Sequence, residues 1–363
     1  TEGIDLTVVG PELPLSMGLV DRFQEAGLKT FGPRRMAARI ETSKVFCKEL
    51  LLKYDVPTAR AEVAEGIDAA RRLLDRRPLP LVIKAEGLAA GKGVVVAATR
   101  EEADRGLDEL SGLGEASRRI LIEDFLSGEE MSFLVLTDGE RALPLGTARD
   151  YKRVFDGDQG PNTGGMGTLS PSPLIGQDLE EVILKRIIGP TLRGLSREGE
   201  PYRGVLYAGL MLTSQGPMVL EYNARFGDPE TQVILPRLQS DLLALMEQVA
   251  GGGLPSTIDW RSEASVCVVA AAKGYPGPYR KGDEIEGLDQ VGQSEGLFVF
   301  HAGTYRQNEK WLTRGGRVLG VTALGNGMEK ARERAYAAIR QIRFEGMHYR
   351  RDIGLTKSGQ TIA

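Results

Sequence analysis

A carboxylate and an amide stand two residues apart in the stretch PMVLEYNARFGDPET, residues 217–231. Side chains alternate along a strand, so Glu221 and Asn223 are expected to share one face. Carboxylate and amide oxygens are hard ligands, and they suit a Mg²⁺ ion that is already bound to substrate phosphates. Arg225 follows at once and can hold a phosphate or carboxylate in bidentate fashion. Polar residues also decorate many solvated strand ends, so E-x-N alone is weak evidence for a metal site.

Two lysines flank a glycine-rich turn in VIKAEGLAAGKGVVV, residues 82–96. Burying the Lys84 ammonium in an apolar strand is expensive without a partner, which is either a ligand phosphate or an internal carboxylate. Residues 87–93 offer backbone N–H groups and Lys92 to phosphates, because glycine permits close approach; the alternative is a flexible hairpin turn. A P-loop is excluded, since Gly93 stands where the magnesium-binding hydroxyl would be.

A third candidate segment is ILIEDFLSGEE, residues 120–130, which ends a strand and continues as an extended, partly apolar segment. Backbone groups from Glu123 to Leu126 are suited to reading the edge of an adenine ring. Glu130 is suited to accepting hydrogen bonds from ribose hydroxyls. Acidic residues at strand ends are usually just exposed to solvent, so this segment alone is weak evidence for nucleotide binding.

The elements that must position these residues alternate between helix and strand over residues 60–126 and become β-rich toward the C-terminus. A helix over 41–57 is expected to start at an N-cap, Thr42 or Ser43, and to stop before Pro57. Further helices are expected from the capping box TREE at 99–102, near 177–198 and near 327–342. Strands are expected at 6–9, 81–85, 94–98, 119–126, 265–272, 297–301 and 317–323, with hairpins over 129–147 and 204–223.

Bulk composition is that of a globular enzyme of two or three domains, with 363 residues, 41% hydrophobic, 26% charged and a net charge of −4. This balance gives no electrostatic reason to expect nucleic acid or a membrane as partner. The sequence shows no membrane-length apolar run and no signal-peptide pattern, so we expect a cytoplasmic protein. Cys47 and Cys267 are expected to be reduced core thiols. His301 and His348 are too far apart for a histidine metal site.

The start of the chain, GIDLTVVGPELPL over residues 3–15, reads as a buried parallel strand followed by a turn. Such a strand needs sheet neighbours, and residues 21–33 supply only one helix and one further strand. We expect that the sequence lacks its true N-terminal part, or that these residues complete a sheet made elsewhere.

The order of these parts resembles the ATP-grasp superfamily: Lys44 on an early helix, a strand lysine, a glycine loop, an E-x-x-L hinge and a late E-x-N strand. Within it, GPELPL, IKAEGLAAGKGV, DYKR, GPNTGGMG, YAGLM and EYNARFGDPETQ resemble the glycinamide ribonucleotide synthetase family. The stretches AAKGYPGPYRKGD, FHAGT and GGRVLGVTALG resemble its C-terminal domain. The resemblance covers essentially the whole chain, and GPNTGGMG with RFGDPETQ is specific to that family.

The resemblance implies an α/β and α+β multidomain protein with an ATP-grasp fold, a truncated N-terminal β-α-β domain and a small β-rich C-terminal domain. The expected domains are the remainder of the N-terminal domain (1–40), a central ATP-grasp subdomain (41–59 and 127–252), a lid subdomain (60–126) and the C-terminal domain (253–363).

The resemblance also implies roles for particular residues. The ATP-binding residues would be Lys44, Lys84, Gly91, Lys92, Gly93, Glu123, Phe125, Leu126 and Glu130. The substrate-binding residues would be Glu12, Lys152, Asn162, Thr163, Gly164, Gly165, Gly167 and Asp228. Arg225 and Asp150 would be catalytic, and Glu221 and Asn223 would hold Mg²⁺ or Mn²⁺. Two departures from the family pattern are a missing glycine-rich N-terminal loop and the absence of a carboxylate in GVLYAGLMLT.

The function that the resemblance implies is an ATP-dependent ligase of de novo purine synthesis. It would join glycine to 5-phosphoribosylamine through glycyl phosphate, giving glycinamide ribonucleotide, ADP and phosphate. Its partners would be these small molecules, with no obligate protein partner evident. The alternatives are another ATP-grasp carboxylate–amine ligase of purine metabolism, against which GPNTGGMG argues, and a non-catalytic ATP-binding protein of the same fold. Intact Lys84, Glu221 and Asn223 argue against the last alternative.

Overall fold

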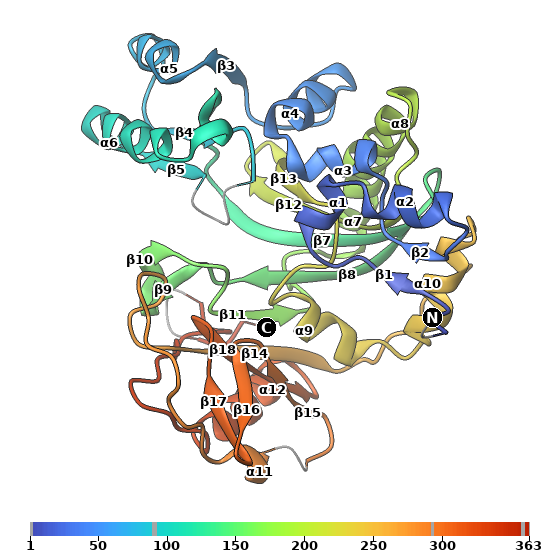
Figure 1. The fold of residues 1–363 in the computed structure, drawn as a ribbon, viewed down its shortest axis with the longest axis vertical. Helices are drawn as coiled ribbons and strands as arrows, with labels where there is room; N and C mark the ends of the chain where they lie inside the picture. The colour runs from blue at the N-terminus through green and yellow to red at the C-terminus, as the bar shows by residue number, and fades with distance from the viewer. Residues whose placement is uncertain (1–2, 89–92, 292–293, 357–359, 363) are drawn as a thin grey trace. The chain divides into compact units, whose positions relative to one another are not determined.

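The computed structural model describes residues 3–88, 93–291, 294–356 and 360–362. The chain divides into two compact units, which are described separately below (Figure 1). The first unit comprises Thr1–Leu145, Gln177–Phe226 and Leu242–Thr257, and the second comprises Gly146–Gly176, Gly227–Asp241 and Ile258–Ala363. The four-part domain division expected from the sequence stays a prediction.

The N-terminal segment of the first unit is a small parallel β-α-β arrangement. Strand β1 (Thr7–Val8) pairs in parallel with β2 (Thr30–Phe31), as the sequence predicts, but the prediction that it is buried is wrong, since Thr7 is half-buried and Val8 is exposed. The helices of this segment are α1 (Glu12–Ser16), α2 (Leu19–Glu25) and α3 (Arg35–Thr42).

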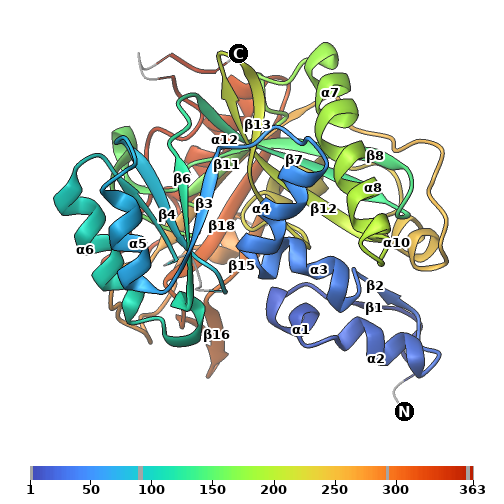
Figure 2. The same ribbon diagram turned by 90° about the horizontal axis from the view of Figure 1, so that it is seen from above.

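A four-stranded antiparallel sheet forms the next part of the first unit, in the order β3-β6-β4-β5. Its strands are β3 (Ala61–Glu65), β6 (Arg119–Asp124), β4 (Leu81–Ala85) and β5 (Val94–Ala97). Helices α5 (Ile67–Leu74) and α6 (Arg100–Ser111) pack on it side by side (Figure 2). The predicted capping box is present, with the Thr99 side chain accepting from Glu102 N and the Glu102 side chain from Thr99 N.

Alternation along these strands separates an apolar face from a polar one. Leu81, Ile83, Ile120 and Ile122 are buried in one core cluster with residues of α5 and α6. Lys84 and Glu123 occupy the intervening positions, so they project from the opposite face of the sheet. The polar residues that the sequence singles out therefore lie away from the two helices.

The rest of the first unit is built on longer antiparallel strands in the order β13-β12-β7-β8. These strands are β13 (Gly216–Asn223), β12 (Gly204–Thr213), β7 (Glu129–Thr137) and β8 (Ala142–Asp150), of which residues 142–145 belong to the first unit and the remainder to the second. The accompanying helices are α4 (Lys44–Lys53), α7 (Gln177–Ile183), α8 (Gly189–Arg197) and α10 (Leu242–Ala250), with a π-helical turn at Leu184–Ile188 joining α7 to α8. Both hairpins expected from the sequence are present.

The helix predicted over 41–57 is confirmed in one of its two candidate N-caps, Ser43, and is wrong in its range. Ser43 has an extended backbone, with φ −135° and ψ 103°, so residues 41–42 end α3 and a separate helix, α4, begins at Lys44. The Ser43 side chain accepts a hydrogen bond from Phe46 N and is the N-cap. Helix α4 ends at Lys53, because Asp55 has φ 54° and cannot continue a right-handed helix.

The second unit continues from β8 through β11, β14, β18 and β15, all antiparallel. These strands are β11 (Gly167–Ser170), β14 (Ala264–Ala271), β18 (Arg317–Gly325) and β15 (Leu297–His301). Helix α12 (Met328–Ile339) packs against β14 and β18 (Figure 1). The smaller elements are β9 (Arg153–Phe155), β10 (Gln159–Asn162), β16 (Thr304–Gln307), β17 (Lys310–Thr313), α9 (Thr231–Ile234) and α11 (Leu288–Val291). The short 3₁₀ turns of the chain are Gly114–Ser117, Asp156–Asp158 and Leu235–Arg237.

The two cysteines are core residues, as the sequence predicts. Cys47 and Cys267 are both buried and unbridged. Burial raises the pKa of each thiol to about 12, so neither is poised as a nucleophile. Among the described residues, no helix combines the length and the apolar character needed to cross a bilayer.

Candidate nucleotide and acceptor sites

The candidate metal pair lies near the end of β13. Tyr222 is buried, and its hydroxyl lies 2.8 Å from Thr191 Oγ1, whereas Glu221 is exposed. The expected alternation of faces around Glu221 and Asn223 is therefore present. Glu221 pairs with Gly209 of β12. A Cβ on residue 209 would come within 3.3 Å of Glu221 Cγ, so glycine at this position avoids a close contact with the Glu221 side chain.

The donor set of this pair fits a divalent cation that is shared with substrate. One carboxylate and one amide oxygen suit a Mg²⁺ ion that keeps waters and phosphate oxygens as its other ligands. In the described part of the chain, no group of three or more His, Cys, Asp or Glu residues is placed to hold a metal by itself. The site would thus depend on the nucleotide for completion.

Lys84 is buried and already has protein partners. The residue is 7% exposed, and its Nζ lies 3.0 Å from Glu123 Oε2 and donates to Leu220 O at 2.9 Å. Of the two partners that the sequence left open for Lys84, the internal carboxylate is therefore present. Strand β6 ends at Asp124, and the exposed Phe125 and half-buried Leu126 follow outside the sheet, where a hinge segment is expected.

Lys48 is a member of this cluster that the sequence interpretation missed. Its Nζ lies 3.2 Å from Glu123 Oε1 and donates to Thr58 Oγ1 at 2.6 Å and to Ala59 O at 3.0 Å. The available signal was its position on α4, three residues from both Val45 and Leu51, which are buried. A lysine on the apolar face of a helix requires an acceptor in the interior.

Lys44 is the first residue of α4, and its Nζ donates to Gly87 O at 2.9 Å. Burial lowers the pKa of the Lys44 ammonium and the charge of Lys84 acts in the same direction, whereas the charge of Glu221 raises it. The lysine thus lies within electrostatic reach of the candidate metal ligand. Glu86, also missed, holds the start of α4 by accepting from Ser43 Oγ at 2.5 Å and from Val45 N at 2.8 Å.

The other expected nucleotide-binding residues are spread over two strands. Gly93 O accepts from Ala85 N at 2.8 Å at the base of the β4–β5 hairpin. Glu130 is exposed on β7 opposite Met211. Gly91 and Lys92 lie outside the described residues.

Arg225 lies between two carboxylates of the first unit. Its Nη2 is 3.0 Å from Glu41 Oε1 and its Nε is 3.7 Å from Glu12 Oε2. Glu41, which the sequence interpretation missed, also accepts from Ala224 N at 2.6 Å. Burial raises the pKa of the Glu41 carboxyl, and Arg225 acts against that rise. Glu12 thus belongs with Arg225 and not with the other expected substrate residues, which lie in the second unit.

The expected acceptor residues of the second unit meet around a tight turn. Gly165 has φ 109°, and a Cβ on it would come within 2.7 Å of Asp150 Oδ1 and 2.5 Å of Pro229 Cδ, so only glycine fits. Thr163 Oγ1 accepts from Gly165 N at 3.0 Å and donates to Lys152 O at 2.8 Å. The GPNTGGMG segment is therefore packed directly onto Asp150.

Arg317 of the GGRVLG segment stabilises this turn through hydrogen bonds. The sequence interpretation missed it as a site residue. It donates to Gly164 O at 2.5 Å, to Asp228 O at 3.0 Å and to Asp228 Oδ2 at 2.9 Å. Asn162 is exposed at the end of β10. Gly167 opens β11, where Ile353 and Cys267 O leave no room for a Cβ.

Asp150 is the carboxyl of this cluster whose pKa is raised well above its ordinary value. Its Oδ1 is buried with no hydrogen-bond partner in the described structure. Burial raises the pKa of the Asp150 carboxyl well above its ordinary value; the charge of Glu230 adds to the rise, and Lys152 and Arg317 oppose it. Because Glu230 is itself 3% exposed, two carboxylates share a poorly solvated region.

Asp150→Asn should gain stability relative to the wild type as the pH rises above about 4. The folded state binds the Asp150 proton more tightly than the unfolded state does. This tighter proton binding by Asp150 therefore stabilises the folded wild type at acidic pH, and the stabilisation is lost as the pH rises through the raised pKa of the folded state. Urea unfolding of both proteins at several pH values measures the difference in unfolding free energy. A difference that does not change with pH would show that Asp150 is ionised normally.

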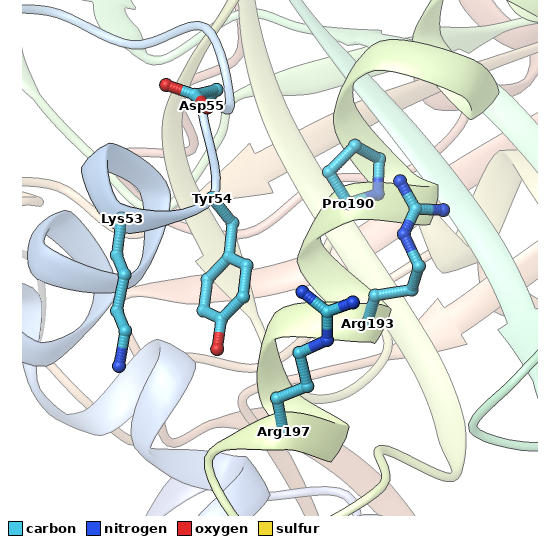
Figure 3. A pocket seen from close by; sticks show the side chains of 6 residues that line it. All are labelled: Lys53, Tyr54, Asp55, Pro190, Arg193 and Arg197. Atoms are coloured by element: carbon cyan, nitrogen blue, oxygen red, sulfur yellow. The ribbon is translucent and has the colours of Figure 1, made fainter.

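A separate hollow of about 410 Å³ lies between the end of α4 and α8 (Figure 3). It is lined by Lys53, Tyr54, Asp55, Pro190, Arg193 and Arg197. Figure 3 shows the Arg197 guanidinium directed toward Tyr54 and the Arg193 guanidinium beside Pro190. None of the expected site residues lines this hollow, so the candidate chemistry rests on the polar clusters described above.

Three family models match consecutive parts of the chain. They describe the N domain (residues 1–41), the ATP-grasp (A) domain (42–231) and the C domain (265–356) of phosphoribosylglycinamide synthetase. The chain belongs to the phosphoribosylglycinamide synthetase family. The family resemblance and the ATP-grasp fold predicted from the sequence are thereby confirmed.

Curated members of this family are similar to the chain along nearly its whole length. A phosphoribosylamine–glycine ligase of Vibrio vulnificus (strain CMCP6) is 50% identical over 358 residues, which cover 97% of this chain and 83% of that protein. The protein of the same name from Salmonella typhimurium is 51% identical over 359 residues, with the same coverage.

Solved structures support the same fold. The crystal structure of phosphoribosylamine–glycine ligase from Thermotoga maritima is 40% identical, with a TM-score of 0.80, and the match covers 89% of this chain and 81% of that one. A biotin carboxylase domain of 2-oxoglutarate carboxylase from Hydrogenobacter thermophilus is 18% identical, with a TM-score of 0.76 over 96% of this chain and 76% of that one. The second likeness shows the shared fold alone.

Proposed function

We propose that the chain is an ATP-dependent ligase that joins glycine to 5-phosphoribosylamine in purine biosynthesis. The products are glycinamide ribonucleotide, ADP and phosphate. Membership of the phosphoribosylglycinamide synthetase family over nearly the whole chain is the observation that carries this proposal. The polar clusters of both units supply residue types that suit the reaction.

The chemistry needs positioning and charge neutralisation more than it needs a nucleophilic side chain. A carboxylate oxygen of glycine attacks the γ-phosphorus of ATP, and ADP leaves. The amine of phosphoribosylamine then attacks the acyl carbon of glycyl phosphate, phosphate leaves, and the nitrogen loses a proton. Binding both substrates in line with the nucleotide supplies most of the acceleration. The buried, high-pKa thiols fit this absence of covalent catalysis.

Nucleotide binding is assigned to the first unit. Lys44 and Lys84 would contact phosphates, with Gly91, Lys92 and Gly93 from the glycine loop. The segment from Glu123 through Phe125 to Leu126 would border the adenine, and Glu130 the ribose. Glu221 and Asn223 would hold Mg²⁺, or Mn²⁺ in its place, and the bound metal supplies neutralisation of phosphate charge. Arg225 and Glu12 would lie beside the reacting groups.

Acceptor binding is assigned to the turn of the second unit that packs on Asp150. The residues proposed for it share this turn or its neighbours, and they are Lys152, Asn162, Thr163, Gly164, Gly165, Gly167 and Asp228. Arg317 supports this turn through its bonds to Gly164 and Asp228. Location in the cytoplasm and function without an obligate protein partner stay predictions.

ADP release should require both glycine and freshly prepared phosphoribosylamine. A coupled assay on the intact chain measures ADP with both substrates, with each alone, and with neither. Release that needs another carboxylate or amine would favour a different ATP-grasp ligase of purine metabolism. Nucleotide binding without any substrate-dependent release would favour a non-catalytic ATP-binding protein.

A further inference from the structure

Three charged side chains form a buried cluster in the first unit, defined here as the lysine–glutamate triad: Lys48, Glu123 and Lys84. Glu123 Oε1 lies 3.2 Å from Lys48 Nζ and Glu123 Oε2 lies 3.0 Å from Lys84 Nζ. The three residues are 4%, 3% and 7% exposed. Each oxygen of the single carboxylate thus faces a different ammonium group.

The two lysines differ in how many of their N–H donors are already used. Lys48 meets three acceptors, namely Glu123, Thr58 Oγ1 at 2.6 Å and Ala59 O at 3.0 Å, which satisfy all three donors of an ammonium. Among the described residues, Lys84 meets two acceptors, Glu123 and Leu220 O. One donor of Lys84 therefore remains for a ligand, whereas Lys48 has none to offer.

The charges of the triad do not cancel. Two ammonium groups and one carboxylate leave one positive charge in a region with little water, which is costly without a further anion. Burial lowers the pKa of the Lys48 ammonium, and the Glu123 carboxylate opposes that change. An anionic oxygen at the remaining donor of Lys84 would balance the charge.

The triad joins three elements beside the candidate metal ligands. Lys48 belongs to α4, Glu123 to β6 and Lys84 to β4. Thr58 Oγ1, which accepts from Lys48, donates to Val219 O of β13 at 2.8 Å. Lys84 donates to Leu220 O, the residue before Glu221. A shift of any triad member would therefore move the Lys84 ammonium relative to the strand that carries Glu221.

We propose that Lys48 is a positioning residue for nucleotide binding. It holds one oxygen of Glu123 so that the other oxygen fixes the Lys84 ammonium beside β13, with one N–H directed to an anionic phosphate oxygen of ATP. Lys48 itself does not touch the nucleotide. This assignment rests on the proposed function only for the identity of the nucleotide.

Lys48→Met should raise the KM and the dissociation constant for ATP by about tenfold, the scale of one lost charge-assisted hydrogen bond. The KM for glycine should stay unchanged, because the acceptor site proposed in the second unit includes no member of the triad. Lys48→Arg keeps a cation opposite Glu123 and should restore most of the ATP affinity. Lys53→Met is the matched control, since Lys53 lies on the same helix and forms a surface pair with Glu198 at 2.6 Å.

Melting temperature and calorimetric ATP binding are measured for each variant alongside the kinetics. A Lys48→Met protein that melts early but binds ATP normally would overturn the proposal and make the triad purely structural. Should that variant fail to fold, Lys48→Gln is used instead, because it keeps a donor for Thr58 Oγ1 and Ala59 O but lacks the charge that holds Glu123. Weak ATP binding by Lys48→Gln supports the proposal, and normal binding overturns it. Because calorimetry needs no turnover, wild-type protein that binds ATP without ligase activity would refute the proposed function alone.

Discussion

Glu221→Ala should reduce kcat by about a hundredfold or more while leaving the melting temperature close to that of the wild type. The Glu221 side chain is exposed on β13, so its removal opens no core cavity. Its carboxylate is the one anionic ligand in the Glu221–Asn223 pair, and the charge of Glu221 also reaches the Lys44 ammonium. Losing it would weaken the site for the phosphate-bridging metal.

The measurement is kcat at saturating substrates over a range of Mg²⁺ concentrations. Glu65→Ala is a suitable control, because Glu65 is also an exposed strand glutamate but lies on β3 outside the candidate site. Near-normal turnover of Glu221→Ala at ordinary Mg²⁺ would place the metal elsewhere.

Lys84→Met should weaken both ATP binding and the fold. The variant leaves Glu123 Oε2 without its ammonium partner while Lys48 still balances the carboxylate charge, and an unsatisfied buried acceptor costs about 1–3 kcal/mol of stability. It also removes the ammonium donor that is available to a phosphate. The dissociation constant for ATP should therefore rise tenfold or more, which corresponds to a loss of about 1.4 kcal/mol of binding free energy.

Calorimetry with ATP and thermal melting separate the two effects of Lys84→Met. Lys53→Met again serves as the comparison, since it removes a lysine from the surface of the same unit. Early melting with unchanged ATP affinity would show that Lys84 is only an internal partner of Glu123 and Lys48.

Local sequence signals predicted the features that depend on near neighbours in the chain. The capping box at Thr99 and the alternation around Tyr222 follow from spacing alone, and the structure contains both. The fold and family depended on motif order along the chain, since no single motif was sufficient.

Apart from Lys48, whose position on the apolar face of α4 was a local signal, the missed residues act through contacts between distant segments. Glu86 reaches Ser43, Glu41 reaches Arg225, and Arg317 reaches Gly164. Spacing along the chain does not predict such long-range pairs. The partner of Lys84 could not be chosen from the sequence for the same reason, because it depended on the contact between Lys84 and Glu123. The N-cap Ser43 was among the predicted candidates, whereas the end of α4 at Lys53 was misplaced, because the left-handed backbone of Asp55 was not predicted from its residue type.

Transfer of oxygen from glycine to phosphate tests the proposed ligase mechanism most directly. Glycine labelled with ¹⁸O in its carboxylate is incubated with ATP, phosphoribosylamine and the intact chain, and the released phosphate is analysed by mass. Attack of the carboxylate on the γ-phosphorus predicts one ¹⁸O atom in each phosphate formed. Unlabelled phosphate, released in step with ADP, would mean that water attacks ATP, and it would contradict formation of glycyl phosphate.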